Sequence, residues 1–118
     1  MVVHPDLDPA LLAFVKCHIT SFVKWEVLRS LSEGVGFWAD PSTLAQELHR
    51  PVENVREALD ELAREELVER HGTLDEPVYR LSEGEPTTVV VTRLMTRATR
   101  SQELRRIVVA HILHEAVA

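Results

Sequence analysis

The end of the chain carries the residue types that most often ligate metal ions. His114 and Glu115 follow His111 by three and four residues, so a helix places all of them on one side. Imidazole nitrogens and carboxylates ligate zinc-like ions, and Cys17-His18 could add ligands from the same or another subunit. His111 also falls in an apolar helical stripe, where a histidine ordinarily packs without a metal. A metal site is therefore a minor alternative, and we expect no cofactor.

No other pattern indicates catalysis. The chain has no glycine-rich phosphate loop, no serine elbow and no C-x-x-C pair. Carboxylates crowd residues 57–66, but their helical spacing predicts a solvated charged surface. We therefore expect a protein that is not an enzyme.

Residues 40–66 predict two helices that are joined by a tight turn. Asp40 can cap the first helix, and Pro41 fits its first turn because the missing N–H would be unpaired there. His49-Arg50-Pro51 interrupts the pattern. Apolar residues recur at helical spacing on both sides of this turn: Leu44, Ala45, Leu48, Val55, Leu59 and Leu62. A gap of about three residues is typical of a helix-turn-helix.

A hairpin is expected after the second helix. Residues 67–70 and 78–81 are the two strand candidates, and glycine, aspartate and proline between them favour a loop. Residues 37–39 could form a short strand that pairs with this hairpin. Trp38 within it is either a ligand-stacking residue or, as we prefer, a core anchor under the hairpin.

The run LAQELHRPVENVREALDELAREELVER resembles the second helix, turn, recognition helix and first wing strand of winged helix-turn-helix bacterial regulators. The resemblance implies a mostly α (α+β) fold, with a winged-helix core and additional helices at both ends.

The expected organisation is a disordered N-terminus at 1–7 and a single domain at 8–118. The core spans 21–82, with flanking helices at 8–20 and 87–117. Ser21 is a candidate cap if the N-terminal helical stretch breaks at Thr20-Ser21, although one continuous helix is also compatible with the pattern. Thr99 to Gln102 has the form of a capping box. The last helix shows a broad apolar stripe that must be buried. Since flanking helices form the dimer interface in the ArsR-type and MarR-type regulators that the chain resembles, we expect a homodimer.

The resemblance also implies DNA binding by the second helix of the motif. Asn54 can read adenine and Arg56 can read guanine in the major groove. Gln46 and Arg50 could contact phosphates, and the cationic candidates of the wing are Arg70, His71 and Arg80. For Arg56 and Arg64, intrahelical ion pairs are an equally plausible role.

The charge distribution keeps alternatives open. The net charge is −6, and residues 52–66 hold two arginines against six carboxylates, net −4. DNA affinity depends on cations that neutralise phosphates. A winged-helix module that binds a protein through this acidic helix is therefore the second hypothesis. The stripe of Arg93, Arg97 and Arg100, with Arg105 and Arg106, could also bind an anionic partner. An ArsR-like metal sensor is the third.

Length and composition set the remaining limits. A chain of 118 residues can build one modest core. A single cysteine excludes an internal disulfide, so a reducing cytoplasm is the expected location. No apolar run approaches the length of a membrane span, and we expect no membrane partner.

Overall fold

The computed structural model describes residues 9–34, 37–83 and 87–117, and the predicted disordered segment 1–7 lies outside them. The chain is mostly helical, with a single two-stranded antiparallel sheet in the described residues, which confirms the α+β class. In chain order the elements are α1 (Pro9–His18), α2 (Phe22–Glu33), α3 (Pro41–Leu48), α4 (Val52–Arg64), β1 (Val68–Gly72), β2 (Pro77–Leu81), α5 (Thr87–Arg100) and α6 (Gln102–Val117).

Side-chain caps begin three of the helices. Ser21 Oγ accepts a hydrogen bond of 3.1 Å from the Lys24 amide, so of the two arrangements that the sequence leaves open, the chain adopts the break before α2. The Asp40 carboxylate accepts from the Thr43 amide at 3.0 Å, and this hydrogen bonding lowers the pKa of Asp40. The predicted capping box at Thr99 is wrong. Ser101 caps α6 instead, because its hydroxyl accepts from the Leu104 amide at 3.1 Å.

A tight turn joins α3 to α4, as the sequence predicts. His49 adopts a left-handed conformation with φ 55° and ψ 45°, and the Arg50 amide donates to the Ala45 carbonyl at 3.0 Å. Pro51 precedes the first helical residue of α4, and no side chain caps this helix. Pro51, Glu53 and Asn54 are exposed, so the first turn of α4 lies at the surface.

The hairpin pairs Val68 with Leu81 and Gly72 with Pro77. A single bridge adds the predicted short segment before α3 to β2. In this bridge the Ala39 and Tyr79 backbones exchange hydrogen bonds of 2.7 and 2.8 Å. Gly72 lies at φ 94°, and a Cβ there would approach the Glu76 carbonyl oxygen to 2.5 Å, so the tip of the hairpin requires glycine.

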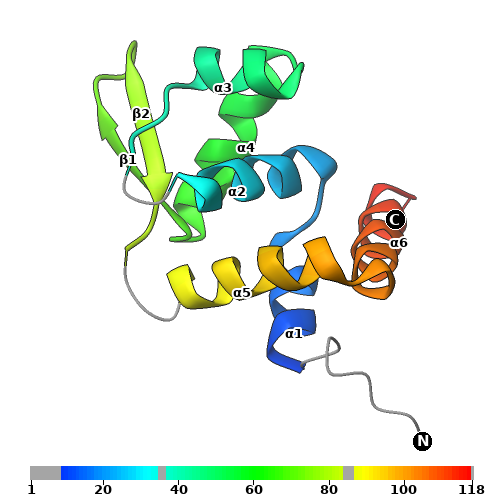
Figure 1. The fold of residues 1–118 in the computed structure, drawn as a ribbon. Helices are drawn as coiled ribbons and strands as arrows, with labels where there is room; N and C mark the ends of the chain where they lie inside the picture. Colours follow the sequence, from blue (N-terminus) through cyan, green and yellow to red (C-terminus); the bar gives the residue numbers. More distant parts are fainter. Residues whose placement is uncertain (1–8, 35–36, 84–86, 118) are drawn as a thin grey trace, which may run out of the picture.

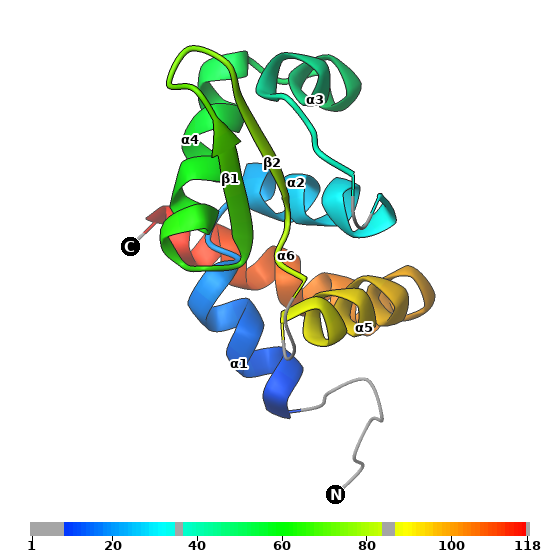
Figure 2. The same ribbon diagram turned by 90° about the vertical axis from the view of Figure 1, so that its left-hand side faces the viewer.

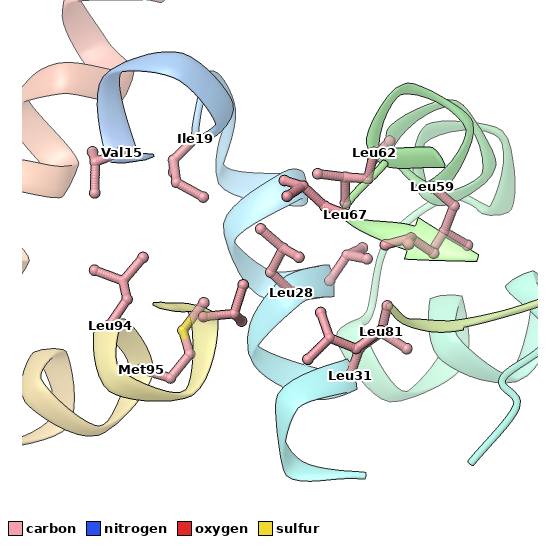
Figure 3. Close-up of a cluster of buried hydrophobic side chains, with 14 of the residues drawn as sticks. Val15, Ile19, Leu28, Leu31, Leu59, Leu62, Leu67, Leu81, Leu94 and Met95 are labelled. Carbon is pink, nitrogen blue, oxygen red and sulfur yellow. The ribbon is translucent and has the colours of Figure 1, made fainter. Parts of the chain in front are cut away.

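Helix α2 lies between two groups of elements (Figure 1). On one side are α3, α4 and the hairpin, and on the other are α1, α5 and α6, as the turned view also shows (Figure 2). Leu28 and Leu31 of α2 contribute to one continuous core that reaches both groups (Figure 3).

The apolar stripe of α6 is largely covered within the chain. Leu104, Val108 and Ile112 are buried, whereas Val109 and Leu113 are 41% and 53% exposed. A second subunit is therefore not needed to cover most of the stripe, and the predicted homodimer rests on a narrower strip than the sequence indicates. Among the described helices, none is long and apolar enough to cross a membrane.

Candidate nucleic-acid interface

The α3–turn–α4 unit presents three of the predicted site residues to solvent. Its buried face consists of Val55, Ala58, Leu59 and Leu62 on α4, with Leu44 and Ala45 on α3. Because these residues face the core, Gln46, Asn54 and Arg56 point outward and are exposed. The side chains of these three residues make no hydrogen bond or ion pair to another described residue. The intrahelical ion pairs considered for Arg56 and Arg64 are likewise absent from the described part of the chain.

Arg50 is held by a carboxylate from α2. Its Nε and Nη2 donate to the two carboxylate oxygens of Glu26 at 3.1 and 2.7 Å. This hydrogen bonding, together with the negative charge of Glu26, raises the pKa of Arg50 above its ordinary value. Such a two-point pair fixes the turn against α2. It also neutralises the cation that the sequence assigns to a phosphate.

Asp60 on α4 connects the helix to the hairpin. The hydroxyl of Tyr79, which is fully buried, donates to Asp60 Oδ1 at 2.6 Å. Arg70 approaches the same oxygen at 3.8 Å and lies 5.9 Å from the centre of the Tyr79 ring. Burial first, and then the bond to Asp60, raises the pKa of Tyr79 to about 12.

This geometry predicts the titration of the only tyrosine in the chain. The folded state favours neutral Tyr79, so its contribution is present below the ordinary pKa of 10.0 and is lost as pH rises from there to about 12. The shift corresponds to about 2 to 3 kcal/mol. Tyrosinate absorbance should therefore rise near pH 12 in the folded chain and near pH 10 in denaturant. Tyr79→Phe, the control, should remove the signal, and a folded-state midpoint near 10.0 would contradict the buried arrangement.

A buried lysine binds the C-terminal end of α4. Lys24 is 4% exposed, and its Nζ lies 2.8 and 3.2 Å from the two Glu65 oxygens and 3.6 Å from Glu61. Thr20 Oγ1 completes its surroundings at 3.4 Å, and His18 Nδ1 lies 3.0 Å from Glu65. A buried ammonium requires such partners, because desolvation of an unpaired charge is costly. Two carboxylates that the sequence assigns to solvent therefore hold α4 on α2.

We expect Lys24→Met to lower the free energy of unfolding by about 2 kcal/mol. The value lies below the roughly 3–5 kcal/mol of a fully buried pair, because Glu65 and Glu61 are 25% and 41% exposed. Adding Glu65→Gln should restore part of the loss, so a double-mutant cycle in urea should give a coupling of about 1 kcal/mol or more. Lys16→Met, at an exposed position of α1, is the matched control and should be neutral. Additive effects of Lys24→Met and Glu65→Gln would exclude the pair.

These contacts change how the acidity of α4 is distributed. Asp60, Glu61 and Glu65 have cationic or hydroxyl partners, and all belong to the C-terminal half of the segment. The first two turns of α4, which we call the α4 tip (residues 52–58), carry Arg56 against Glu53 and Glu57. The tip has a net charge of −1. It is therefore close to neutral, in contrast to the segment as a whole.

The hairpin does not supply free cations. Arg80 Nε donates to Glu69 at 2.9 Å, and its Nη1 lies 3.1 Å from Glu83. Its guanidinium also lies 4.4 Å from the centre of the Trp38 ring. Both arginines of the predicted wing thus have carboxylate neighbours. Residues 67–83 hold two arginines against four carboxylates, net −2.

The minor metal-site hypothesis gains no support from the described residues. His111 is half-buried, with an Nε2 that is buried and has no hydrogen-bond partner, whereas His114 and Glu115 are exposed. His18 contacts Glu65 and Cys17 is exposed. Within 9–34, 37–83 and 87–117, no group of three or more potential metal ligands lies together.

The arginines of α5 and α6 do not form one uniform stripe. Arg93 and Arg100 are exposed and Arg97 is half-buried. Arg105 folds back on α5, where its Nη1 donates to the carbonyls of Ala98 and Thr99 at 2.6 and 3.0 Å. A cation at this place satisfies carbonyls that the end of a helix leaves unpaired. Arg105 thus closes α5, a role that the sequence analysis missed.

Comparison of the chain with protein-family models, with curated proteins and with solved structures finds no match. We therefore base a function on the geometry of the described residues. Two residues outside the predicted site set matter most for it. Lys24 orients α4 through its contact with Glu65. Trp38, for which the sequence favours a position in the core, is instead 39% exposed. The only signal for Lys24 in the sequence is its helical spacing, which places it on the buried face of α2 with Val27, Leu28 and Leu31.

Proposed function

We propose that the chain is a DNA-binding transcriptional regulator whose residues 21–82 act as a winged helix-turn-helix. The order α2, α3, α4, β1, β2 and the short turn between α3 and α4 support this proposal. In such a motif the N-terminal part of the second helix contacts base edges in the major groove. The α4 tip is the corresponding element here.

One observation carries the proposal. The exposed hydrogen-bonding side chains of Gln46, Asn54 and Arg56 have no partner among the described residues and belong to the α3–turn–α4 unit. Asn54 offers the donor and acceptor that adenine requires, and Arg56 offers the paired donors that guanine requires. The carboxylates farther along α4 are meanwhile bound to Lys24 and Tyr79.

The charge pattern predicts an unusual binding mode. Arg50, Arg70 and Arg80 all have carboxylate neighbours, so few cations remain to neutralise phosphates. Because the salt dependence reports the number of phosphates contacted, the slope of log K against log [salt] should be only about −1 to −2. Specificity then depends mainly on base contacts by the α4 tip.

Selection from sheared genomic DNA of the source organism, at about 50 mM salt, tests the proposal, because low salt strengthens phosphate contacts. We expect enrichment of a short site, and a near-palindromic one with half-sites about one helical turn apart would support the homodimer. Enrichment no greater than that of an unrelated acidic protein of similar size would overturn the proposal.

The acidity of the hairpin favours a second candidate function, a winged-helix module that binds a protein. The net charge of −2 over residues 67–83 opposes contact with phosphates and suits a basic partner. The selection separates the two candidates, since a pure interaction module enriches no sequence.

For the homodimer, the strip of Val109, Ala110 and Leu113 on α6 offers the contact surface. This strip and Arg106 line an open groove of about 390 Å³. Apolar residues on an exposed helix face are typical of an interface between subunits.

A further inference from the structure

The hairpin has an outer face that the proposed DNA contact does not use. We call Trp38, Glu69, His71, Val78 and Arg80 the hairpin face. The strand register places Glu69 opposite Arg80 and His71 opposite Val78, and the bridge at Ala39 places Trp38 beside Arg80. Alternate side chains of a strand point to opposite sides, and the buried Tyr79 and Leu81 occupy the inner one.

Trp38 is an exposed aromatic side chain that its neighbours hold in place. Its ring stacks edge-on with His71 at a centroid distance of 4.6 Å, and the Arg80 guanidinium lies 4.4 Å from its centre. Trp38 as a whole is nevertheless 39% exposed, and the neighbouring Phe37 is 76% exposed. A fixed and partly exposed tryptophan is typical of the centre of a protein interface, because little conformational entropy is lost on binding.

The backbone beside Trp38 forms an open sheet edge. Both backbone groups of Ala39 bond to Tyr79, so those of Trp38 point away from β2. The Trp38 N–H and C=O make no hydrogen bond to any residue in the described ranges. An unpaired edge of this kind can accept an added strand, which is a common way to bind an extended peptide.

The charge around this edge selects the partner. Arg80 is already bound by Glu69 and Glu83, whose side chains remain 36% and 58% exposed. Asp75 and Glu76 at the tip of the hairpin are exposed as well. Phosphates would be repelled here, whereas an arginine or lysine could bind a carboxylate or the indole face.

We propose that this edge and the hairpin face bind an extended, basic segment of another protein, which adds as a strand beside residues 37–39. Backbone hydrogen bonds to Trp38 align the segment, and its basic side chains contact the indole, Glu69 and Glu83. The inference goes beyond DNA binding by the α4 tip and does not depend on it.

Nuclear magnetic resonance of the full ¹⁵N-labelled chain tests the proposal. The probe is the capped peptide Arg-Val-Arg-Val-Arg, and its counterpart Glu-Val-Glu-Val-Glu is the matched control. We expect the arginine peptide to shift the Trp38 indole and the amides of residues 37–40, with a Kd on the order of 1 mM or tighter. The other tryptophan, Trp25 on α2, should not respond. No shift at millimolar peptide, or equal shifts with the glutamate peptide, would overturn the proposal.

Three variants sharpen the test. Trp38→Ala should weaken binding about tenfold, as loss of an aromatic anchor does. Glu83→Gln, which leaves the sheet intact, should weaken it about threefold, the size expected for an exposed ion pair. Leu74→Ala, at an exposed site on the hairpin tip, should have no effect. Unchanged affinity in both Trp38→Ala and Glu83→Gln, or a DNA duplex that shifts the Trp38 signals more strongly than the peptide, would refute a basic protein partner.

Discussion

Asn54→Ala combined with Arg56→Ala should strongly weaken sequence-specific DNA binding while leaving the fold intact. A good two-point contact to a base contributes about 1–3 kcal/mol of discrimination, so the pair together should lower specific affinity roughly 30-fold to 10⁴-fold. Both side chains are exposed, and the buried face of α4 is unchanged. Alanine also favours the helix. Affinity for the selected site, measured by fluorescence anisotropy with thermal unfolding in parallel, checks both parts of the prediction.

Arg64→Ala is the matched control for this experiment. Arg64 is also an exposed arginine of α4 without an ion pair among the described residues, but it lies two turns beyond Arg56. It should retain nearly all of the specific affinity, because in the proposed binding mode only the start of α4 reaches the bases. Equal binding by the double variant and the wild type would exclude the α4 tip as the reading element. Loss of binding in Arg100→Glu instead would locate the contact on α5.

The α3–turn–α4 unit could be predicted from sequence because its signals are local. Asp40 and Pro41 indicate the start of α3, and the spacing of Val55, Leu59 and Leu62 predicts the buried face of α4. Helix capping and helical periodicity both depend on residues that lie within a few positions of one another. The exposure of Asn54 and Arg56 follows directly, since they occupy the opposite side of the same helix.

The electrostatics of the site could not be predicted, because they depend on pairs that are distant in sequence. Arg50 meets Glu26 across 24 positions, and Lys24 meets Glu65 across 41. In the sequence each of these residues appears as an isolated surface charge. Only the packing of α2 against α4 shows that they are neutralised.

The predictions for the apolar stripe of α6 and for Trp38 were wrong for a related reason. Periodicity shows that a helix has an apolar face but not which surface covers it. The stripe of α6 therefore suggested a second subunit, whereas α1 and α5 of the same chain cover most of it. For Trp38 the error is the opposite one. A large aromatic residue in a short strand suggests a core position, but the side chain of Trp38 is on the outer side of the sheet and is partly exposed.

The position of the α4 tip relative to α1, α5 and α6 depends on α2, and the variant Leu28→Ala tests this dependence. Leu28 is fully buried on the helix between the two groups of elements (Figure 3). Leu28→Ala should lower the free energy of unfolding by about 2–5 kcal/mol, because it removes apolar contacts and leaves a cavity. That is a large part of the roughly 5–15 kcal/mol that stabilises a typical domain. In urea, the midpoint should fall while the m-value stays the same.

Arg29→Ala, at the next and exposed position of α2, is the control. It removes only the Arg29–Glu33 contact of 3.7 Å and should cost less than about 0.5 kcal/mol. A single transition that shifts as a whole in Leu28→Ala would mean that α3, α4 and the hairpin unfold together with α1, α5 and α6. Two separate transitions, or a loss below about 1 kcal/mol, would mean that the two groups are not joined through Leu28. In the first case the core around α2 fixes the α4 tip relative to α6, so the proposed dimer through α6 would set the distance between the two α4 tips.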